Sequence, residues 1–259
     1  MKTYLALDVG GSSIKYALIQ EDSTILEKSS VPTPMDTMDH FVETIGTIYD
    51  QYKDRIEGMA ISMPGIINPE IGYAFTGGAL RYIDKMNIVD ILKERCPINI
   101  TIGNDAKCAA NAEIGYGNLQ DIQDGAVVIL GTGIGGCLIK DHKVHTGRHF
   151  SAGEFSFVKT NCLDGISWDY AWSTRNGIKG LLERVQESLG TNQEYTGIEI
   201  FDMANEGNEK VIEGISQFCK EVATQIFNVH IIFDILYYTH VSLNLCIYLI
   251  LQGVQFHLL

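Results

Sequence analysis

Basic residues are scarce in this sequence. Lysine and arginine make up 19 of the 259 residues, against 32 aspartates and glutamates, which gives a formal net charge of −13. A surface of this sign repels nucleic-acid phosphates, so we expect no nucleic-acid partner. The same charge is compatible with an enzyme that handles small phosphate compounds, because backbone N–H groups and a metal ion can hold phosphate without a basic surface.

Paired cysteines and a leader segment are also missing. The six cysteines include no Cys-x-x-Cys pair, which argues against a zinc knuckle and against a redox pair. The first residues contain no long apolar run of the kind found in a secretory signal. We therefore expect a cytoplasmic protein with reduced thiols and without a zinc site.

Charge is absent from the C-terminal end, where residues 235–259 contain no Lys, Arg, Asp or Glu. A membrane span needs about 20 largely apolar residues. Thr239, His240 and Ser242 interrupt the first half of this stretch, so we expect no membrane segment. Neither a helical period nor a strand period is convincing there, and the stretch is predicted to be an aberrant apolar tail.

Before this tail, apolar periodicity predicts a mixture of strands and helices, and 46% of all residues are apolar, enough for a sizeable core. From residue 168 to 233 the pattern is mainly helical. The predicted strands cover 4–7, 14–19, 24–27, 58–63, 98–102, 126–130 and 137–140, and the predicted helices cover 38–52, 88–95 and 105–115.

One arrangement occurs twice: a strand, a glycine-rich turn and a second strand, first within the opening 20 residues and again around residues 126–140. This repetition predicts a duplicated architecture whose two turns bind phosphate and face a common cleft. The predicted N-terminal lobe is 1–120, the C-terminal lobe is 121–234, and the tail is 235–259.

The first turn combines a carboxylate, two glycines, two hydroxyls and an amine, from Asp8, Gly10, Gly11, Ser12, Ser13 and Lys15. An acid at the end of a buried strand needs a partner, and Mg²⁺ is a suitable one. Glycines let the backbone approach phosphate oxygens closely. The alternative is an ordinary glycine hairpin that carries a surface aspartate.

The second turn is built from Gly131, Thr132, Gly133, Ile134, Gly135 and Gly136. These letters also fit the dinucleotide pattern G-x-G-x-x-G, with Glu154 at roughly the distance of a ribose-binding acid. That pattern must open a helix, whereas the residues that follow here have the character of a strand. We therefore favour a phosphate turn over a dinucleotide site.

Two further carboxylates are candidates for the chemistry. Asp105 follows a predicted strand and could act as a general base toward a sugar hydroxyl, with Asn104 bonding a second hydroxyl. Both types of residue are also favoured helix caps, which is the alternative. Glu154 could accept two hydrogen bonds from neighbouring sugar hydroxyls, or it could be a surface loop acid.

The order of these motifs resembles the ROK family of bacterial sugar kinases and sugar-responsive repressors, over residues 1 to about 234. The subset without a zinc knuckle is the most similar, particularly the beta-glucoside kinases, through TGGALRYIDKMNI and GRHFSAGEF. The segments that carry the resemblance are LALDVGGSSIKYALI, ISMPGIINPEIG, FTGGALRYID, IGNDAKCAANAE, VILGTGIGGCLI and SAGEF.

The resemblance implies an α/β fold of the two-lobed actin-like ATPase (ribonuclease H-like) type with a cleft between the lobes. It implies that the cofactors are ATP and Mg²⁺ and that Asp8 lies near the metal, directly or through water. It implies that Asp105 is the catalytic base and that Asn104 and Glu154 bind sugar. Gly65 and Gly78 would belong to loops that line the sugar pocket, and the two glycine-rich turns would bind phosphate.

The sequence departs from the family in two places. The usual Glu-x-Gly-His is Glu154-Phe155-Ser156-Phe157 here, and the downstream cysteine cluster is missing, so zinc is not predicted. The glycine run that cradles adenosine in the family does not follow Asp234. We therefore expect the C-terminal part of the second lobe to be incomplete, as after a truncation or a shift of reading frame.

The function that follows is transfer of the γ-phosphate of ATP to a hydroxyl, the 6-hydroxyl in our interpretation, of a hexose or beta-glucoside. The alternatives are a non-catalytic sugar-binding remnant and a sugar-responsive regulator of the same family. Regulators of the family carry a helix-turn-helix before the first phosphate motif, for which the sequence has no room. The expected partners are a small-molecule sugar and, as in many family members, a second copy of the chain.

Overall fold

The structure is a computed structural model, and its described residues form two compact units. The sequence places the boundary near residue 120, whereas the structure divides the chain between Ala109 and Ala110, within one helix. Unit 1 comprises Met1–Ala109 and Gly147–Ser151, and unit 2 comprises Ala110–Thr146 and the described residues that follow Ser151. The described residues are 1–161, 167–235 and 237–242.

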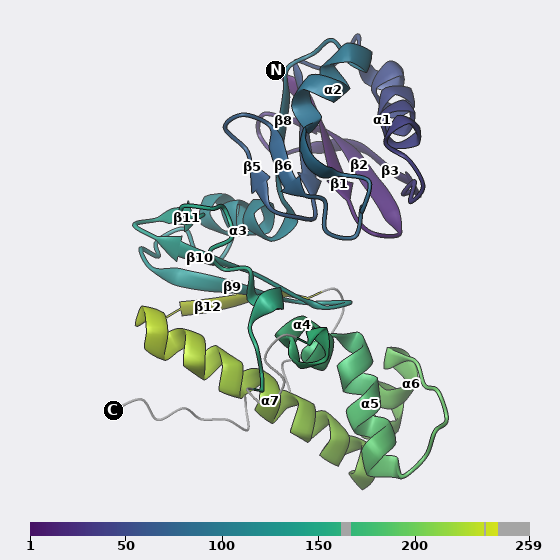
Figure 1. Ribbon diagram of the computed structural model, residues 1–259, viewed down its shortest axis with the longest axis vertical. Coiled ribbons are helices and arrows are strands. Elements are labelled where there is room, and N and C mark those ends of the chain that lie inside the picture. Colours follow the sequence, from purple (N-terminus) through teal and green to yellow (C-terminus); the bar gives the residue numbers. More distant parts are fainter. Residues whose placement is uncertain (162–166, 236, 243–259) are drawn as a thin grey trace. The chain divides into compact units, whose positions relative to one another are not determined.

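Unit 1 is built on a five-stranded sheet with the order β3-β2-β1-β4-β8 (Figure 1). Strands β1, β4 and β8 are parallel, and β2 and β3 are antiparallel additions at one edge. A small antiparallel sheet, β5-β6-β7, accompanies it. The elements are β1 (Thr3–Val9), β2 (Ser13–Gln20), β3 (Ile25–Pro32), α1 (Met38–Tyr52), β4 (Gly58–Met63), β5 (Ile67–Asn68), β6 (Tyr73–Thr76), β7 (Asp84–Asn87), α2 (Ile88–Arg95), β8 (Ile100–Asn104) and α3 (Asp105–Tyr116).

The alternation of side chains along β1 separates the two faces of this sheet. Leu5, Leu7 and Val9 are buried in one core cluster with Phe41 and Ile45 of α1. Since successive side chains of a strand point to opposite faces, Asp8 lies on the other face, where it is exposed. One face of the sheet therefore builds the core, and the opposite face is left to carry polar groups.

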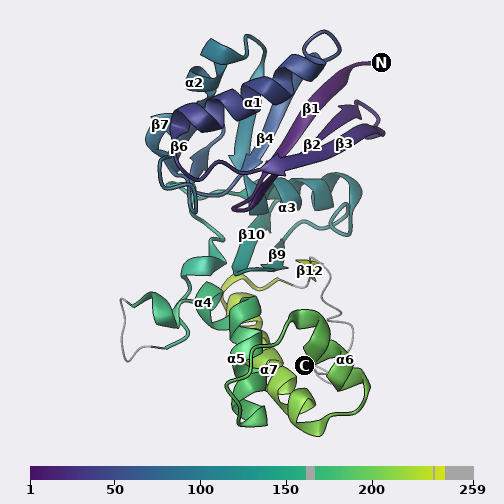
Figure 2. The same ribbon diagram turned by 90° about the vertical axis from the view of Figure 1, so that its right-hand side faces the viewer.

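Unit 2 contains a four-stranded sheet with the order β11-β10-β9-β12 and a group of helices in which α5 packs along α7 (Figure 2). Trp172 and Phe155 anchor its core, with ring centroids 5.7 Å apart. The elements are β9 (Gly125–Leu130), β10 (Ile134–Lys140), β11 (Lys143–His145), η1 (Phe155–Phe157), η2 (Trp168–Tyr170), α4 (Trp172–Asn176), α5 (Ile178–Leu189), α6 (Gly197–Asn205), α7 (Glu209–Phe233) and β12 (Tyr237–Ser242).

Most predicted elements agree with the structure. The helices predicted at 38–52 and 88–95 and the strand at 58–63 have the bounds of α1, α2 and β4. The strand after the second glycine-rich turn begins at Ile134 rather than at Cys137, so Gly135 and Gly136 belong to β10. None of the helices among the described residues is both long and apolar enough to cross a membrane.

The start of the tail contradicts the sequence analysis, which found no convincing strand there. Strand β12 pairs in parallel with β9, from Tyr237 opposite Gly125 to Ser242 opposite Leu130. Helix α7 ends at Phe233, and its C-cap Asp234 has a left-handed φ of 50°. Backbone hydrogen bonds to a sheet edge need no side-chain period, which is why the pattern gave no signal. Residue 236 and the rest of the predicted tail, residues 243–259, lie outside the described residues.

A buried ion pair joins α5 to α7 in unit 2. The Arg184 guanidinium, with its side chain 4% exposed, donates from Nε to Glu221 Oε1 at 2.9 Å and from its terminal amine to Oε2 at 3.1 Å. Asn176 Nδ2 also donates to Glu221 Oε2, at 3.2 Å. One carboxylate therefore connects three helical segments.

Glu221→Ala should lower the free energy of unfolding by about 2–3 kcal/mol. It removes both hydrogen bonds of the buried Arg184 and leaves it only the exposed Glu187, 3.9 Å away, while Glu221 itself keeps some contact with water. Urea denaturation monitored by circular dichroism measures this. The control is Glu183→Ala, which removes an exposed partner of Lys179 and should cost less than about 0.5 kcal/mol. Equal losses in the two variants would contradict the role of the buried pair.

Candidate active site

The predicted site residues of unit 1 come together where β1, β4 and β8 end. In the sheet register, Asp8 of β1 lies opposite Ser62 of β4, and Ser62 lies opposite Gly103 of β8. Ser62 Oγ donates to Asp8 Oδ1 at 3.2 Å, and Asp105 follows β8 directly. The carboxyl ends of parallel strands are the usual place for ligands in open α/β sheets, because the chain leaves the sheet there without covering the edge.

Asp8 reaches this edge for a different reason than the sequence suggested. The carboxylate is exposed rather than buried at a strand end, so no partner is needed to offset burial. Lys15 lies directly opposite Asp8 in the antiparallel β1–β2 pair, which places both side chains on the same face of the sheet. An exposed carboxylate beside a hydroxyl fits Mg²⁺, which takes one or two carboxylates and completes its shell with water and phosphate oxygens.

The first glycine-rich turn is a tight hairpin between β1 and β2. Gly10 N–H donates to Ser13 O at 3.0 Å, and Thr33 Oγ1 donates to Gly10 O at 2.7 Å. The N–H group of Gly10 is therefore hydrogen-bonded within the turn, whereas Gly11 and Ser12 are exposed at its tip. Their contact with a phosphate remains a prediction.

Asn104 is the residue that positions the candidate base. It is 4% exposed, and its Nδ2 donates to Gly65 O and to Asp105 Oδ1, each at 3.0 Å. Its Oδ1 accepts from Lys107 N–H at 3.0 Å, so Asn104 is the N-cap of α3. Both amide hydrogens are thus used within the protein, and the sugar contact predicted for Asn104 would have to use the oxygen.

Asp105 is the first residue of α3, and its own geometry suits a base. Oδ1 accepts from Asn104 Nδ2 and from Ala106 N–H, the latter at 2.8 Å. These two bonds fix the carboxyl group and leave Oδ2 as the oxygen that can receive a proton. The cap that sequence analysis offered as the alternative role for Asp105 is supplied by Asn104, so the capping function and the candidate catalytic function fall on neighbouring residues.

The loop that accepts the Asn104 bond has a backbone that requires glycine. Gly65 has a φ of +108°, and a Cβ there would lie 1.9 Å from Thr76 O. Gly78, with a φ of +61°, packs on the same loop, where a Cβ would stand 3.1 Å from Pro64 Cβ. The two loops that the resemblance assigned to a sugar pocket therefore pack on each other and reach Asp105 through Asn104.

Asp8, Lys15, Ser62 and Asp105 line one open groove of 870 Å³ in unit 1. Asp105 is exposed on the groove side, yet surrounding protein removes much of the water around its carboxyl. This desolvation raises the pKa of Asp105 above its ordinary value; the Ala106 N–H opposes the shift, and the charge of Asp8 adds to it. A raised pKa makes the carboxylate a stronger base near neutral pH.

Cys108, one turn along α3 in the same groove, does not offer a nucleophile. Burial raises the pKa of its thiol to about 11, and the Asp105 charge contributes in the same direction. The thiol is therefore neutral at pH 7 and weakly reactive.

The second glycine-rich turn occupies the corresponding place in unit 2, between β9 and β10. Gly131 N–H donates to Gly133 O, and Ile178 N–H at the start of α5 donates to Gly131 O, both at 3.0 Å. Because β10, not a helix, follows the turn, it does not have the context of a dinucleotide fingerprint. Gly136 lies inside β10, and a Cβ there would meet the Phe155 ring, so this glycine serves packing.

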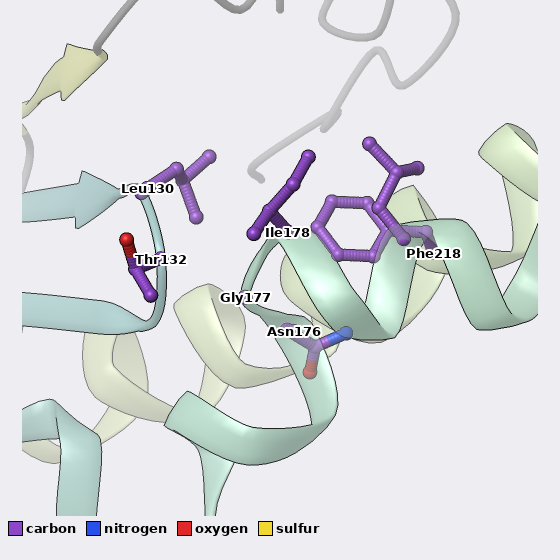
Figure 3. A pocket seen from close by; sticks show the side chains of 8 residues that line it. Leu130, Thr132, Asn176, Gly177, Ile178 and Phe218 are labelled. Atoms are coloured by element: carbon purple, nitrogen blue, oxygen red, sulfur yellow. The ribbon is translucent and has the colours of Figure 1, made fainter. Parts of the chain in front are cut away.

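A pocket of 250 Å³ opens beside this turn (Figure 3). Leu130, Ile178 and Phe218 give it an apolar lining, and Thr132 lies on the side of the strands. Gly131 also lines the pocket. Asn176, 1% exposed, also lines it; its Oδ1 is buried and has no hydrogen-bond partner in the described part of the chain. An orphaned buried acceptor in a pocket is a position where a ligand donor would be favourable.

Glu154 also belongs to unit 2. It precedes η1, and Gly153 before it has a φ of +75°, with room for no Cβ because Cys137 Cα would be 2.9 Å away. Its role as a sugar ligand stays a prediction. Among the described residues, no group of three or more His, Cys, Asp and Glu side chains is placed to hold a metal ion by itself.

Two functional candidates were missed by the sequence analysis. Ser62 had a signal, since it lies two residues before Pro64 on a predicted strand and shares the period-2 face that leads to the strand end. Asn176 had none, because its pocket is formed by segments that are distant in sequence, the turn at Gly131 and helix α7.

The fold and these two hairpin sites define an α/β protein of the actin-like ATPase type. The chain belongs to the ROK family: the model of the ROK family matches residues 4–237.

Relatives with this fold align over most of the chain. A beta-glucoside kinase of Klebsiella pneumoniae is 28% identical over 231 residues, covering 88% of this chain and 77% of that protein. The Lmo2764 protein of Listeria monocytogenes superposes with a TM-score of 0.84 at 26% identity, over 93% of this chain and 83% of that one. A ROK family protein of Streptococcus pneumoniae TIGR4, solved in complex with sucrose, has a TM-score of 0.81 at 26% identity, over 97% of this chain and 84% of that one.

The pKa of Asp105 tests whether its carboxyl is desolvated in the groove and senses the charge of Asp8. An ordinary aspartate has a pKa of about 3.9. The pKa of Asp105 should lie above this value, because burial and the charge of Asp8 disfavour its charged form. Asp8→Asn should move it back down by removing the negative neighbour. Carbon NMR of labelled carboxyl groups measures both, with Asp105→Asn assigning the signal. A titration that does not respond to Asp8→Asn would contradict the coupling.

Proposed function

We propose that this chain is an ATP-dependent sugar kinase that transfers the γ-phosphoryl group of ATP to the 6-hydroxyl of a hexose or beta-glucoside. One observation carries the proposal: Asp105, fixed by two hydrogen bonds and raised in pKa, shares a groove with the exposed carboxylate of Asp8. A base for the acceptor hydroxyl and an acid suited to a phosphate-bound metal are the two groups that this reaction needs.

On the acceptor side, Asp105 Oδ2 takes the proton of the attacking sugar hydroxyl as that oxygen approaches phosphorus. The proton then resides on Asp105, and the sugar oxygen forms the new P–O bond while the bond to the ADP oxygen breaks. Because phosphoryl transfer is catalysed mainly by positioning and by charge stabilisation, the Asn104 bonds that hold Asp105 matter as much as its basicity.

On the donor side, Asp8 would hold Mg²⁺, directly or through water, with Ser62 as its hydrogen-bonded neighbour. The bound ion would supply neutralisation of the charge on the phosphate oxygens. Lys15, across from Asp8, and the backbone of the first glycine-rich turn would add donors to the phosphates bound in unit 1.

The nucleoside end of ATP would occupy the pocket beside Gly131 and Thr132. Its apolar lining suits a flat base, and Asn176 Oδ1 would accept a hydrogen bond from an amino or hydroxyl group there. The pocket is present in unit 2 although this sequence lacks the glycine run that follows the position of Asp234 in the family. Nucleotide binding by this chain is therefore part of the proposal.

The acceptor class rests on the relatives. The protein from Klebsiella pneumoniae is named a beta-glucoside kinase, and the protein from Streptococcus pneumoniae was solved with a disaccharide. Among the described residues, Cys96, Cys108, Cys137 and Cys219 form no disulfide bond. We place the reaction in the cytoplasm, where ATP is available.

Sugar-dependent ADP release, followed in a coupled assay with ATP, Mg²⁺ and a panel of sugars, tests the activity. The panel contains glucose, cellobiose, fructose, mannose and acetylated amino sugars. Asp105→Asn should lower turnover by about 100- to 10,000-fold and leave sugar binding nearly unchanged, since the amide oxygen can still accept from Ala106 N–H. Asp54→Asn, an exposed aspartate elsewhere in unit 1, is the control. Near-normal turnover in Asp105→Asn would refute the base.

Asn176→Ala tests the nucleotide pocket. The variant should weaken ATP binding about tenfold, the usual size of one lost buried hydrogen bond, and leave sugar binding unaltered. Isothermal titration calorimetry with ATP and, separately, with glucose measures both. Asn228→Ala, an exposed asparagine of α7, is the matched control. Unchanged ATP affinity in Asn176→Ala would place the nucleoside elsewhere.

A further inference from the structure

Three aromatic side chains form a partly exposed cluster in unit 1 that the proposed reaction does not use: Phe75 is exposed, and Tyr73 and Phe150 are half-buried. The rings of Phe75 and Phe150 are stacked, with centroids 6.0 Å apart and an interplanar angle of 22°. Tyr73 meets Phe75 edge-on at 5.1 Å. Phe75 is 38% exposed although it sits on β6, whose neighbour Ala74 is fully buried. Neighbouring apolar side chains that reach the surface can mark a place where a ligand binds.

The backbone at Phe150 is a second, independent sign of function. Its φ is +59°, a conformation that costs a bulky side chain energy and is rare outside glycine, asparagine and aspartate. Strain of this kind persists where the surroundings enforce it, and it gathers at ligand sites. Here the left-handed backbone accompanies the stacking of the Phe150 ring on the ring of Phe75, which lies on β6 more than 70 positions earlier in the chain.

The cluster is tied to the candidate base by a short series of contacts. Phe75 N–H donates to Ile66 O at 2.8 Å, and Ile66 N–H donates to Thr76 Oγ1 at 3.2 Å. The loop that contains Ile66 also contains Gly65, whose carbonyl accepts from Asn104. Asn104 in turn holds Asp105. Phe75 is thus connected through the Gly65 loop to the acceptor site, and Phe150 stacks on Phe75 from the segment Gly147–Ser151.

We propose that Phe75 and Phe150 form a platform for the ring attached to the anomeric oxygen of a beta-glucoside, and so set a preference for two-ring substrates over free glucose. This inference rests on the proposed sugar kinase function. The substituent of a beta-glucoside is attached to the anomeric carbon, which is not the carbon that carries the 6-hydroxyl. When the 6-hydroxyl points to Asp105, the substituent therefore extends toward another part of the acceptor site. A pyranose or aryl ring presents an apolar face there, and aromatic rings are the side chains that bind such faces.

The test compares cellobiose with glucose in the wild-type chain, in Phe75→Ala and in Phe150→Asn. Asparagine tolerates a left-handed backbone, so Phe150→Asn removes the ring without changing the turn. Each variant should lower kcat/KM for cellobiose about tenfold, equivalent to about 1.4 kcal/mol, and leave kcat/KM for glucose within about twofold. Phe75→Leu keeps apolar volume but loses the flat face, and it should lose most of the preference as well.

Tyr116→Ala, which removes an exposed aromatic ring at the end of α3, is the control and should alter neither sugar. Calorimetric titration of cellobiose and glucose without ATP gives a second readout that does not depend on turnover. Glucose turnover with no preference for cellobiose in the wild type, or equal losses for both sugars in the variants, would overturn the platform and leave the kinase standing. No sugar-dependent turnover with any sugar would instead overturn the proposed function.

Light scattering on the same variants tests whether a second copy of the chain, and not a sugar, covers the aromatic pair. If the aromatic pair were covered by a second copy of the chain, Phe75→Ala would change the molar mass in solution and not the sugar preference. That result would overturn the proposal. An unchanged mass together with a loss confined to cellobiose supports it.

Discussion

The amide group of Asn104 is the interaction on which the candidate active site depends. Its two hydrogens hold the Gly65 loop and the Asp105 carboxyl, and its oxygen caps α3. A buried amide with all these bonds made is rigid, because breaking any one leaves a polar atom without a partner in a poorly hydrated place. The base, the acceptor loops and the start of the helix are therefore fixed together, and a change at one affects the others.

This arrangement explains why polar groups collect at one edge of the unit 1 sheet. The core needs Leu5, Leu7 and Val9 on one face of β1, and the period of the strand then places Asp8 on the opposite face. The parallel pairing of β1, β4 and β8 carries that face to Ser62 and to the end of β8. The packing of the hydrophobic core and the assembly of the site are consequences of the same alternation.

Unit 2 repeats the hairpin but uses its glycines differently. Only Gly131 to Gly133 form the turn, while Gly135 and Gly136 continue as strand and make room for Phe155. The turn is held from the other side by α5, through the bond from Ile178 to Gly131. Glu221, the partner of Arg184 between α5 and α7, also accepts a hydrogen bond from Asn176. The position of Asn176 in the pocket beside the turn therefore depends on this ion pair.

The sequence by itself predicted the longer strands, helices α1 to α3, both glycine-rich hairpins, and the candidates Asp8, Asn104 and Asp105, because local patterns of polarity and turn residues carry that information. The short strands β5, β6, β7 and β11 were not predicted, and residues 168–233 were predicted only as mainly helical. Tertiary structure alone decided which groups meet. It showed that Asp8 is exposed, that Asn104 serves the protein before any substrate, that β12 completes the edge of β9, and that Phe75 meets Phe150. Contacts between distant segments depend on how the chain packs around its cores, and no local pattern records that packing.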